Sequence, residues 1–306
     1  MKYEKEQIDF NNKLLALHRW VPDKNDNKGI IQIIHGMAEH VSRYEEMADY
    51  FTEKGYIVCG IDHLGHGDTA NLNNNKYGYF AQIKGWAKVV NANKYISNYL
   101  KDKYSDIPLI VFGHSMGSII ARYYLIGDKL TEGIIISGVM NYQPFVMDLV
   151  ILMAKLEKFL KEDKSKNVID NYLLEMMYNR KFNRDIKKSW LSSSQDVVQK
   201  YNKDERCGFD ISNQMFIDML EGLKTIDKKE KNREISRDAP LLIMSGKDDP
   251  VSNYGQDVKK MFKKYKKGNL VDVKYKIYSD VRHEIIRDQR NEEVYSDLEK
   301  WISEHL

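Results

Sequence analysis

The sequence contains little cysteine and no long apolar run. Cys59 and Cys207 are the two cysteines among 306 residues, and they do not form a C-x-x-C pair. This usage excludes a disulfide framework and a zinc knot and favours reduced thiols, as in a cytoplasm. The apolar window 145–154 is interrupted by Asp148 and is too short to cross a bilayer. We therefore expect neither a disulfide nor a membrane-spanning helix.

An excess of charge of one sign is also missing. The chain carries 48 basic and 45 acidic residues, a net charge of +3, which is too small to indicate a nucleic-acid partner. The first residues, Met1–Gln7, are charged and lack the apolar stretch of a secretory signal. Apolar residues make up 42% and charged residues 30%, as in ordinary globular proteins. We expect a folded, cytoplasmic protein that binds no nucleic acid.

Short apolar segments alternate with helical stretches, and we expect these segments to form strands. They are residues 29–34, 56–61, 107–112, 133–136, 240–244 and 271–278. The first five are continuously apolar, which is typical of strands buried on both faces of a parallel sheet. Residues 4–10 and 14–20, joined by Asn11-Asn12, predict an antiparallel hairpin at one edge. The sequence therefore predicts an α/β fold with a mostly parallel sheet of about eight strands flanked by helices.

Between residues 138 and 240 this alternation stops for roughly a hundred residues, far more than a crossover connection needs. We expect a helical cap inserted over residues 139–237, between two parts of the core, residues 1–138 and 238–306. Residues 227–237, rich in lysine and arginine, are expected to form a solvated link. Helical apolar stripes support the cap: Ile169, Tyr172, Leu173, Met176 and Met177, and then Met215, Phe216, Met219, Leu220 and Leu223 after Ser212 as N-cap.

A G-x-S-x-G pentapeptide stands where a strand meets a helix. Gly113-His114-Ser115-Met116-Gly117 follows the apolar run 107–112 and precedes the helical run 118–122. The serine of such a turn adopts strained dihedrals that lift its hydroxyl above the sheet edge, and the small flanking residues permit the sharp turn. Ser115 is therefore the candidate nucleophile.

A serine hydroxyl needs a base and an orienting carboxylate to react at neutral pH. In proteins with this serine turn the partners follow in the order serine, acid, histidine. His283 and His305 are the two histidines after Ser115. His305 is next to the last residue, where we expect it to face solvent, whereas His283 follows the strand 271–278 in a short polar loop. The base is therefore predicted to be His283.

The acid is expected at the end of the neighbouring strand. Residues 241–246 run directly into Lys247-Asp248-Asp249-Pro250-Val251. Because the carboxyl ends of parallel strands meet at one rim, either carboxylate could reach His283. The position of the strand alone does not decide whether Asp248 or Asp249 is the acid.

With these residues in view, the chain resembles the monoacylglycerol lipase and lysophospholipase group of the α/β-hydrolase superfamily. The resemblance covers nearly the whole sheet-forming part and implies that Asp249, three residues after Gly246, is the acid. The matching motifs are His35-Gly36-Met37-Ala38-Glu39-His40 with Arg43-Tyr44, Asp62-His63-Leu64-Gly65-His66-Gly67, Gly113 to Gly117, and Gly246 to Val251 followed by His283-Glu284.

Acyl transfer also requires hydrogen-bond donors for the oxyanion of the tetrahedral intermediate. The amide after the nucleophile supplies one donor, which is Met116. The resemblance implies that the second is the amide of Met37, after His35-Gly36. We expect Glu39, His40 and Arg43 to form a polar cluster that fixes this loop, with a direct role at the substrate as the alternative. No cofactor is expected.

The segment Asp62–Asp68 holds two histidines and two carboxylates, a set that could ligate a metal. It follows a buried strand and contains two turn glycines, and the resembling family uses this loop to brace the floor of the site without a metal. We therefore expect a structural loop and no metal.

The apolar residues of the window 144–153 could line an acyl pocket, touch a lipid surface or pack in the core, and the sequence does not separate these roles. The resemblance implies a serine carboxylic-ester hydrolase acting on monoacylglycerols, lysophospholipids or similar lipid-like esters. A small-ester carboxylesterase, an amidase or aminopeptidase of the same fold, and a non-catalytic ligand sensor are the alternatives; the oligomeric state stays open. An aminopeptidase would need a carboxylate in the cap to hold the substrate amine, and the candidates are Glu157, Glu162, Asp170 and Glu175.

Overall fold

The computed structural model describes residues 1–24, 27–127, 130–160, 166–168, 175–183, 185–236, 238–268 and 270–306. Within these ranges an eight-stranded sheet runs in the order β1-β2-β4-β3-β5-β6-β7-β8. The strands are β1 (Lys2–Phe10), β2 (Lys13–Val21), β3 (Gly29–Ile34), β4 (Tyr56–Ile61), β5 (Leu109–His114), β6 (Gly133–Ser137), β7 (Leu241–Gly246) and β8 (Val273–Tyr278). The α-helices are α1 (Glu45–Glu53), α2 (Gly67–Leu72), α3 (Gly85–Lys103), α4 (Met116–Arg122), α5 (Pro144–Leu160), α6 (Glu175–Tyr178), α7 (Gln195–Lys203), α8 (Asn213–Lys231), α9 (Gln256–Lys267) and α10 (Asn291–Ser303).

The predicted α/β fold is confirmed. β1 and β2 pair antiparallel around the turn at Asn11-Asn12, both of which have positive φ, and β2 joins the sheet antiparallel to β4. The ladders from β4 through β3, β5, β6 and β7 to β8 are parallel. The expected strand at 107–112 is shifted, because β5 begins at Leu109 and continues to His114, directly before the candidate nucleophile.

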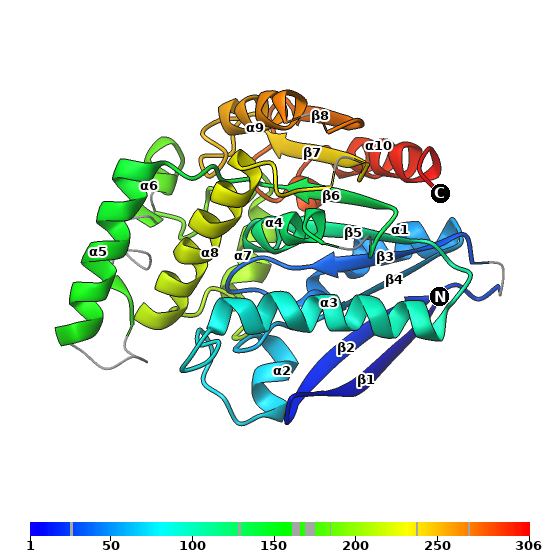
Figure 1. Ribbon diagram of the computed structural model, residues 1–306, viewed down its shortest axis with the longest axis horizontal. Coiled ribbons are helices and arrows are strands. Elements are labelled where there is room, and N and C mark those ends of the chain that lie inside the picture. The colour runs from blue at the N-terminus through cyan, green and yellow to red at the C-terminus, as the bar shows by residue number, and fades with distance from the viewer. Residues whose placement is uncertain are drawn as a thin grey trace.

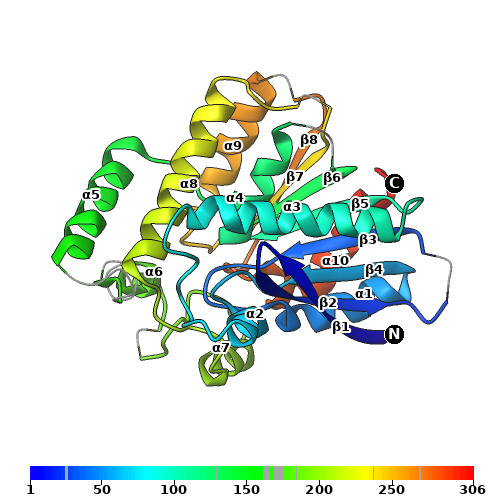
Figure 2. The same cartoon turned by 60° about the horizontal axis from the view of Figure 1, so that its bottom comes forward.

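Both faces of the central strands are buried, which explains their continuous apolar sequences. On β3, Ile30 and Ile34 belong to a buried cluster that also contains residues of α3, α4 and α9, whereas Ile31 and Ile33 belong to a second cluster with residues of α1 and α10. The edge strand β8 differs, since its middle residues are exposed and include Lys274 and Lys276. Figures 1 and 2 show helices on both sides of the sheet, with the two chain ends at the end of the molecule that lies opposite α5.

The chain between β6 and β7, here called the insertion, contains α5, α6, α7 and α8 in its described part. Figure 1 shows α5 and α6 set apart from the sheet, with α8 between them and the core. Ser212 caps α8 by accepting a hydrogen bond from the amide of Met215 at 3.2 Å, as predicted, and the second apolar stripe is buried. Ile169, Tyr172 and Leu173 lie outside the described residues, and Met176 and Met177 are exposed. The boundaries 139–237 stay a prediction.

The expected solvated link at residues 227–237 is only partly correct. Its first residues form the last turns of α8, where Asp227 and Glu230 are buried. Glu230 forms a buried ion pair with Arg122 at the end of α4, 2.7 Å from Nη2 to Oε2, because both side chains meet at the helix interface. Arg237 lies outside the described residues.

Among the described residues, no helix combines the length and the apolar character needed to cross a membrane. Cys59 and Cys207 are free and buried. The cytoplasmic location stays a prediction.

Candidate active site

Ser115 occupies the turn between β5 and α4 with φ 53° and ψ −117°. This strained conformation is held by the amide of Ser115, which donates to the carbonyl of Ser137 at 2.8 Å, and by Ser118, whose amide donates to the carbonyl of Ser115. A Cβ atom on Gly117 would lie 1.9 Å from the carbonyl oxygen of Ile34, and one on Gly113 would lie 2.4 Å from that of Gly117. The two glycines of the pentapeptide are therefore required by close backbone contacts.

His283 and Asp249 meet at the carboxyl ends of β8 and β7. The Nδ1 atom of His283 lies 3.0 Å from Oδ1 of Asp249, and both residues are buried. Ser245 Oγ donates to Oδ2 of Asp249 at 2.9 Å, and the amide of Val251 donates to Oδ1 at 2.9 Å. Ser115 and His283 line the same cavity. The three predicted side chains therefore converge at one rim of the sheet.

The alternative acid and base lie elsewhere. Asp248 is half-buried and its amide donates to the carbonyl of Val281, whereas it is the carboxylate of Asp249 that faces the histidine. His305 lies 2.8 Å from Asp272 and stacks on Trp301 with ring centroids 4.2 Å apart. The expectation that His305 faces solvent was wrong, because these contacts leave its side chain only 9% exposed.

The electrostatics of the pair suit a general base. Burial alone would lower the pKa of His283, but the charge and hydrogen bond of Asp249 raise it above the ordinary value. Burial would raise the pKa of Asp249, yet His283 and the donors of Ser245 and Val251 lower it. The neighbouring His114 is neutral, since burial and the charge of His283 lower its pKa to about 3. Asp249 is therefore ionised and favours the protonated imidazole.

The loop after β3 approaches the nucleophile, as expected for an oxyanion loop. A Cβ atom on Gly36 would lie 3.3 Å from Cβ of Ser115, and Met37 and Met116 both line a cavity with Ser115. The amide of Gly36 donates to Oε1 of Glu39 at 2.6 Å. Ala38 has φ 52°, and its carbonyl accepts from the hydroxyl of Tyr201 in the insertion at 2.8 Å.

A buried cluster of two arginines and two glutamates joins this loop to the histidine loop. Nη1 of Arg43 lies 2.6 Å from Oε2 of Glu39 and 2.7 Å from Oε1 of Glu284, while Nη2 lies 2.8 Å from Oε2 of Glu284. Nη1 of Arg287 lies within 3.8 Å of both carboxylates. Burial would raise the pKa of Glu39 and of Glu284, but Arg43 and Arg287 lower both. Glu39 and Arg43 therefore fix the loop as predicted, and Glu284 shares Arg43 with Glu39.

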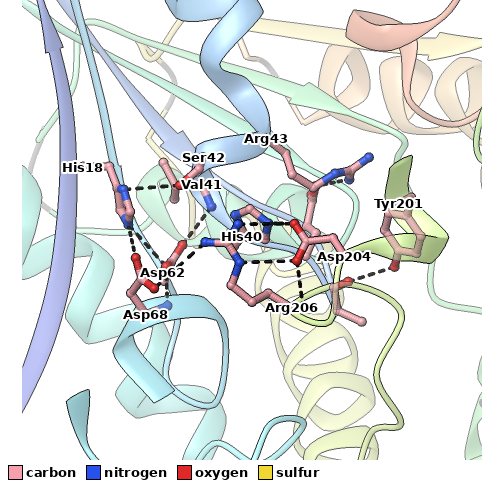
Figure 3. A network of polar contacts seen from close by, with 12 residues as sticks. His18, His40, Val41, Ser42, Arg43, Asp62, Asp68, Tyr201, Asp204 and Arg206 are labelled. Carbon is pink, nitrogen blue, oxygen red and sulfur yellow. Dashed lines mark hydrogen bonds and ion pairs between the residues drawn. The ribbon is translucent and has the colours of Figure 1, made fainter. Parts of the chain in front are cut away.

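His40 instead forms part of a second network, beside the loop Asp62–Asp68. Nε2 of His40 lies 2.8 Å from Oδ2 of Asp204 in the insertion, and Arg206 contacts both oxygens of that carboxylate (Figure 3). Asp62 accepts from His18, from the amide of Val41 at 2.8 Å and from that of Asp68 at 2.7 Å (Figure 3). These contacts join the chain after β3 to β2, to the loop Asp62–Asp68 and to the insertion.

Two groups in this network have ligand atoms within 4.8 Å of one another, as a cation would require: His18 with Asp62 and Asp68, and His40 with Asp204 and Cys207. Both oxygens of Asp62 and of Asp204 already accept hydrogen bonds from the protein. His63 and His66 contact His35 with ring centroids 3.9 and 5.3 Å apart, and burial lowers the pKa of each. The sequence prediction of a loop without metal stays a prediction.

The cavity at Ser115 has two arms. The apolar arm, of about 150 Å³, runs under α5 and α8 and is lined by Met140, Met147, Phe216 and Leu220. The smaller arm, of about 60 Å³, has a mixed lining of Glu39, Lys187, Tyr201 and Asp210 with Leu191, Phe209 and Ile211, and we call it the polar arm for its charged residues. Ser115, Met37, Lys188 and Trp190 line both arms. A substrate with an apolar and a polar part can therefore place its reacting bond at the hydroxyl of Ser115.

Some residues at the site were not found from the sequence. Trp190 and Lys188 come from an irregular part of the insertion, and Trp190 packs on His283 with ring centroids 5.1 Å apart. Glu175 was named as a carboxylate, but its pairing with Lys188 at 2.8 Å was not. Neither Trp190 nor Lys188 belongs to a motif, so only the path of the insertion brings them to Ser115.

The comparisons with known proteins agree with this architecture. A family model described as Hydrolase_4, serine aminopeptidase S33, matches residues 25–290. A monoacylglycerol lipase of Mycolicibacterium smegmatis is 24% identical over 292 residues, which cover 94% of this chain and 92% of that protein. An uncharacterized abhydrolase domain-containing protein of Dictyostelium discoideum is 21% identical over 301 residues, 98% of this chain, but the chain spans only 29% of that protein's length.

A solved structure of a highly thermostable carboxyl esterase from Bacillus coagulans superposes with a TM-score of 0.89 at 24% identity, covering 100% of this chain and 99% of that one. Its likeness supports the fold, and the family model covers most of the chain. The chain therefore belongs to the Hydrolase_4 (serine aminopeptidase, S33) family and is an α/β-hydrolase.

Proposed function

We propose that the protein is a serine carboxylic-ester hydrolase in which Ser115 attacks, His283 moves the proton, and Asp249 orients the imidazole. The observation that carries this proposal is the strained Ser115 at the junction of the two cavity arms, with His283, which is hydrogen-bonded to the buried Asp249, lining the smaller of these arms. A ligand sensor would need neither the strained turn nor this pair.

The proposed reaction has two stages, acylation and deacylation of Ser115. His283 takes the proton of Ser115 as Oγ attacks the ester carbonyl, and the amides of Met37 and Met116 donate to the oxyanion. Collapse of the intermediate breaks the bond to the alcohol, which receives the proton from His283 and leaves an acyl-enzyme. Water, deprotonated by His283, then attacks the acyl-enzyme. The bond from the acyl carbon to Oγ of Ser115 breaks, Ser115 regains the proton from His283, and the acid leaves.

The two arms favour an ester of an apolar acid with a polar alcohol. The apolar arm, rich in methionine, suits an acyl chain, and the polar arm suits a hydroxylated alcohol. Similarity to a monoacylglycerol lipase supports the same class. We therefore propose monoacylglycerols, lysophospholipids or similar lipid-like esters as substrates, with the insertion acting as a cap.

The contacts of Glu175 favour ester over amide or peptide substrates. An aminopeptidase would need a free carboxylate for the substrate amine, but Glu175 accepts from Lys188 and from the indole of Trp190. The carboxylate of Glu157 accepts from the amide of Val168. Glu162 and Asp170 lie outside the described residues.

We also propose that α5 contacts a lipid surface while substrate enters. Its exposed apolar side chains recur every three or four residues, as in an interfacial helix. They are Phe145, Val146, Leu149, Leu152, Met153, Leu156, Phe159 and Leu160. Sedimentation with phosphatidylcholine vesicles tests the contact, which Leu149→Ser with Phe159→Ser should weaken without changing turnover of a dissolved ester.

The mechanism is tested with p-nitrophenyl esters of increasing chain length, a monoacylglycerol, lysophosphatidylcholine and a matched p-nitroanilide. Ser115→Ala should lower ester turnover by roughly a millionfold with an unchanged circular dichroism spectrum. Turnover of the anilide above that of the ester would favour the amidase alternative. A folded Ser115→Ala variant with wild-type turnover would refute the mechanism.

A further inference from the structure

The ring of His283 contacts two other rings. His114, from the end of β5, lies with its centroid 4.7 Å from that of His283 at an interplanar angle of 48°. Trp190, from the insertion, lies at 5.1 Å and 52°. The Nδ1 bond to Asp249 fixes one edge of the imidazole but leaves the ring able to tilt about that bond. The two neighbouring rings limit this tilt.

Trp190 is itself held firmly by groups inside the insertion. Its indole Nε1 donates to Oε2 of Glu175 at 2.8 Å, and its amide donates to Oδ1 of Asn179 at 3.0 Å. Lys188 pairs with the same carboxylate at 2.8 Å and also donates its amide to Oε1. The ring of Tyr178 packs on the indole at 5.1 Å. Because Glu175 is paired with Lys188, its charge is balanced within the insertion.

The backbone around Trp190 is bound to the loop of His283. We call residues 189–193 the strap. The amide of Glu284 donates to the carbonyl of Leu191 at 2.8 Å. Nη1 of Arg282 donates to the carbonyls of Ser189 at 2.7 Å and of Ser192 at 2.9 Å. Arg282 is therefore bonded to the strap on both sides of Trp190, and Glu284 is bonded to it on one side.

More contacts extend this attachment beyond the immediate neighbours. The amide of Ser193 donates to both oxygens of Asp288 at 3.1 Å, and its hydroxyl also contacts that carboxylate. Oδ2 of Asp288 in turn accepts from the amide of Arg282 at 2.7 Å. The strap and the histidine loop thus behave as one unit, although about ninety residues separate them in the sequence.

We infer that Trp190 is a positioning residue for His283 and that Glu175 orients Trp190, so that the insertion helps to set the catalytic base. The inference rests on the proposed function. The imidazole becomes a cation when it takes the proton of Ser115, and an indole attracts a nearby cation most strongly of the aromatic rings. Trp190 and His283 also line the same cavity arm in contact with each other, so the indole covers a face of the imidazole that would otherwise border the cavity.

The test compares Trp190→Leu with Trp190→Phe, and Glu175→Leu with Glu175→Gln. Trp86→Phe is the matched control, because it removes a buried indole that packs on Gly222 of α8 and lines neither cavity arm. For each variant, kcat and KM are measured with p-nitrophenyl butyrate. The rate of inactivation by diisopropyl fluorophosphate is a second readout, since this reagent needs the activated serine but not the apolar arm.

Trp190→Leu is expected to lower kcat and the inactivation rate together by about tenfold, with KM changed less than about twofold. Trp190→Phe and Glu175→Gln, which keep a ring and a hydrogen-bond acceptor, should restore most of both rates. Glu175→Leu should resemble Trp190→Leu, and Trp86→Phe should match the wild type. Circular dichroism and thermal unfolding establish that each variant is folded.

The inference is overturned if folded Trp190→Leu keeps wild-type kcat and inactivation rate, or if it raises KM alone, since the indole would then only line the substrate cavity. If Trp190→Leu does not fold, equal rates for Glu175→Leu and Glu175→Gln overturn the orienting role. Failure of the proposed function gives a different result, because Ser115→Ala would then retain turnover whatever the Trp190 variants do.

Discussion

Replacing Arg43 with methionine should destabilise the protein more than any exposed charge would. Arg43 is 10% exposed in its side chain and donates three hydrogen bonds to Glu39 and Glu284, which are 3% and 2% exposed. Methionine fills similar volume but removes the cation. Two buried carboxylates then share the single guanidinium of Arg287, whose Nη1 lies 3.8 and 3.6 Å from them.

The magnitude follows from this count of charges. Removing one partner of a buried ion pair costs about 3 to 5 kcal/mol, because the remaining charge stays buried and unpaired. Against a total stability of about 5 to 15 kcal/mol, this is a large fraction. For a chain of this size it corresponds to a fall in Tm of roughly 5 to 8 °C. Activity should fall as well, since Glu39 holds the amide of Gly36 beside Ser115.

The loss of stability caused by Arg43→Met should become smaller as the pH falls. In the wild type, burial opposes ionisation of Glu39 and Glu284, but Arg43 lowers the pKa of both below the ordinary value of 4.5. Their ionised forms therefore stabilise the folded state above pH 4.5, and this stabilisation is lost as the pH falls further. Without Arg43 both carboxylates protonate more readily. The difference in Tm between variant and wild type should therefore shrink from pH 7.5 to pH 5.

Differential scanning calorimetry at both pH values measures this difference, and Arg206→Met is the control. Arg206 also pairs with a carboxylate, at 3.3 Å from Asp204, but is 35% exposed, so its loss should cost below about 1 kcal/mol. Arg43→Met with Glu284→Gln should recover part of the lost stability by removing the surplus charge. A single Arg43→Met variant as stable as Arg206→Met would refute the reasoning.

Two further predictions follow from buried carboxylates. Because the charge of Asp249 raises the pKa of His283 against the effect of burial, wild-type kcat/KM should rise with pH through a midpoint above 6.5. Asp249→Asn should move that midpoint to lower pH and lower kcat by about ten thousandfold. An unmoved midpoint would contradict the assignment of Asp249. Glu230→Gln should lower the free energy of unfolding, measured in urea at pH 7, by about 3 to 5 kcal/mol, because it leaves the buried Arg122 without its anion. The control Glu234→Gln, at an exposed residue, should lower it by nothing measurable. Equal urea midpoints for the two variants would show that the buried pair contributes little.

The sheet was predictable because local sequence encodes it strongly. Strands buried on both faces need continuous apolar runs, and residues 29–34 and 56–61 coincide with β3 and β4. The error at β5 has a simple cause, since Gly113 and His114 interrupt the apolar run and yet remain on the parallel ladder with β6. Apolar character marks where a strand is buried better than where its hydrogen bonds end.

For the candidate site too, local sequence predicted some residues and missed others. Ser115, Asp249 and His283 were predicted because each follows a strand and belongs to a local motif. Glu230 was misjudged because five basic residues surround it in sequence, whereas its buried partner Arg122 lies more than a hundred residues earlier. Local charge density predicts exposure correctly for the lysines but gives no information about a partner on another helix.

The loop of His283 illustrates why the remaining contacts required a structure. Asp249 holds the imidazole from β7, Arg43 holds Glu284 from the chain after β3, and Leu191 accepts the amide of Glu284 from the insertion. None of these partners is set by spacing along the chain, since each depends on where a separate connection returns to the rim. Because an imidazole misplaced by about 1 Å can cost a hundredfold in rate, a loop without regular structure needs such independent attachments. In the proposed mechanism, the insertion therefore helps to position His283 and also forms part of the cavity wall.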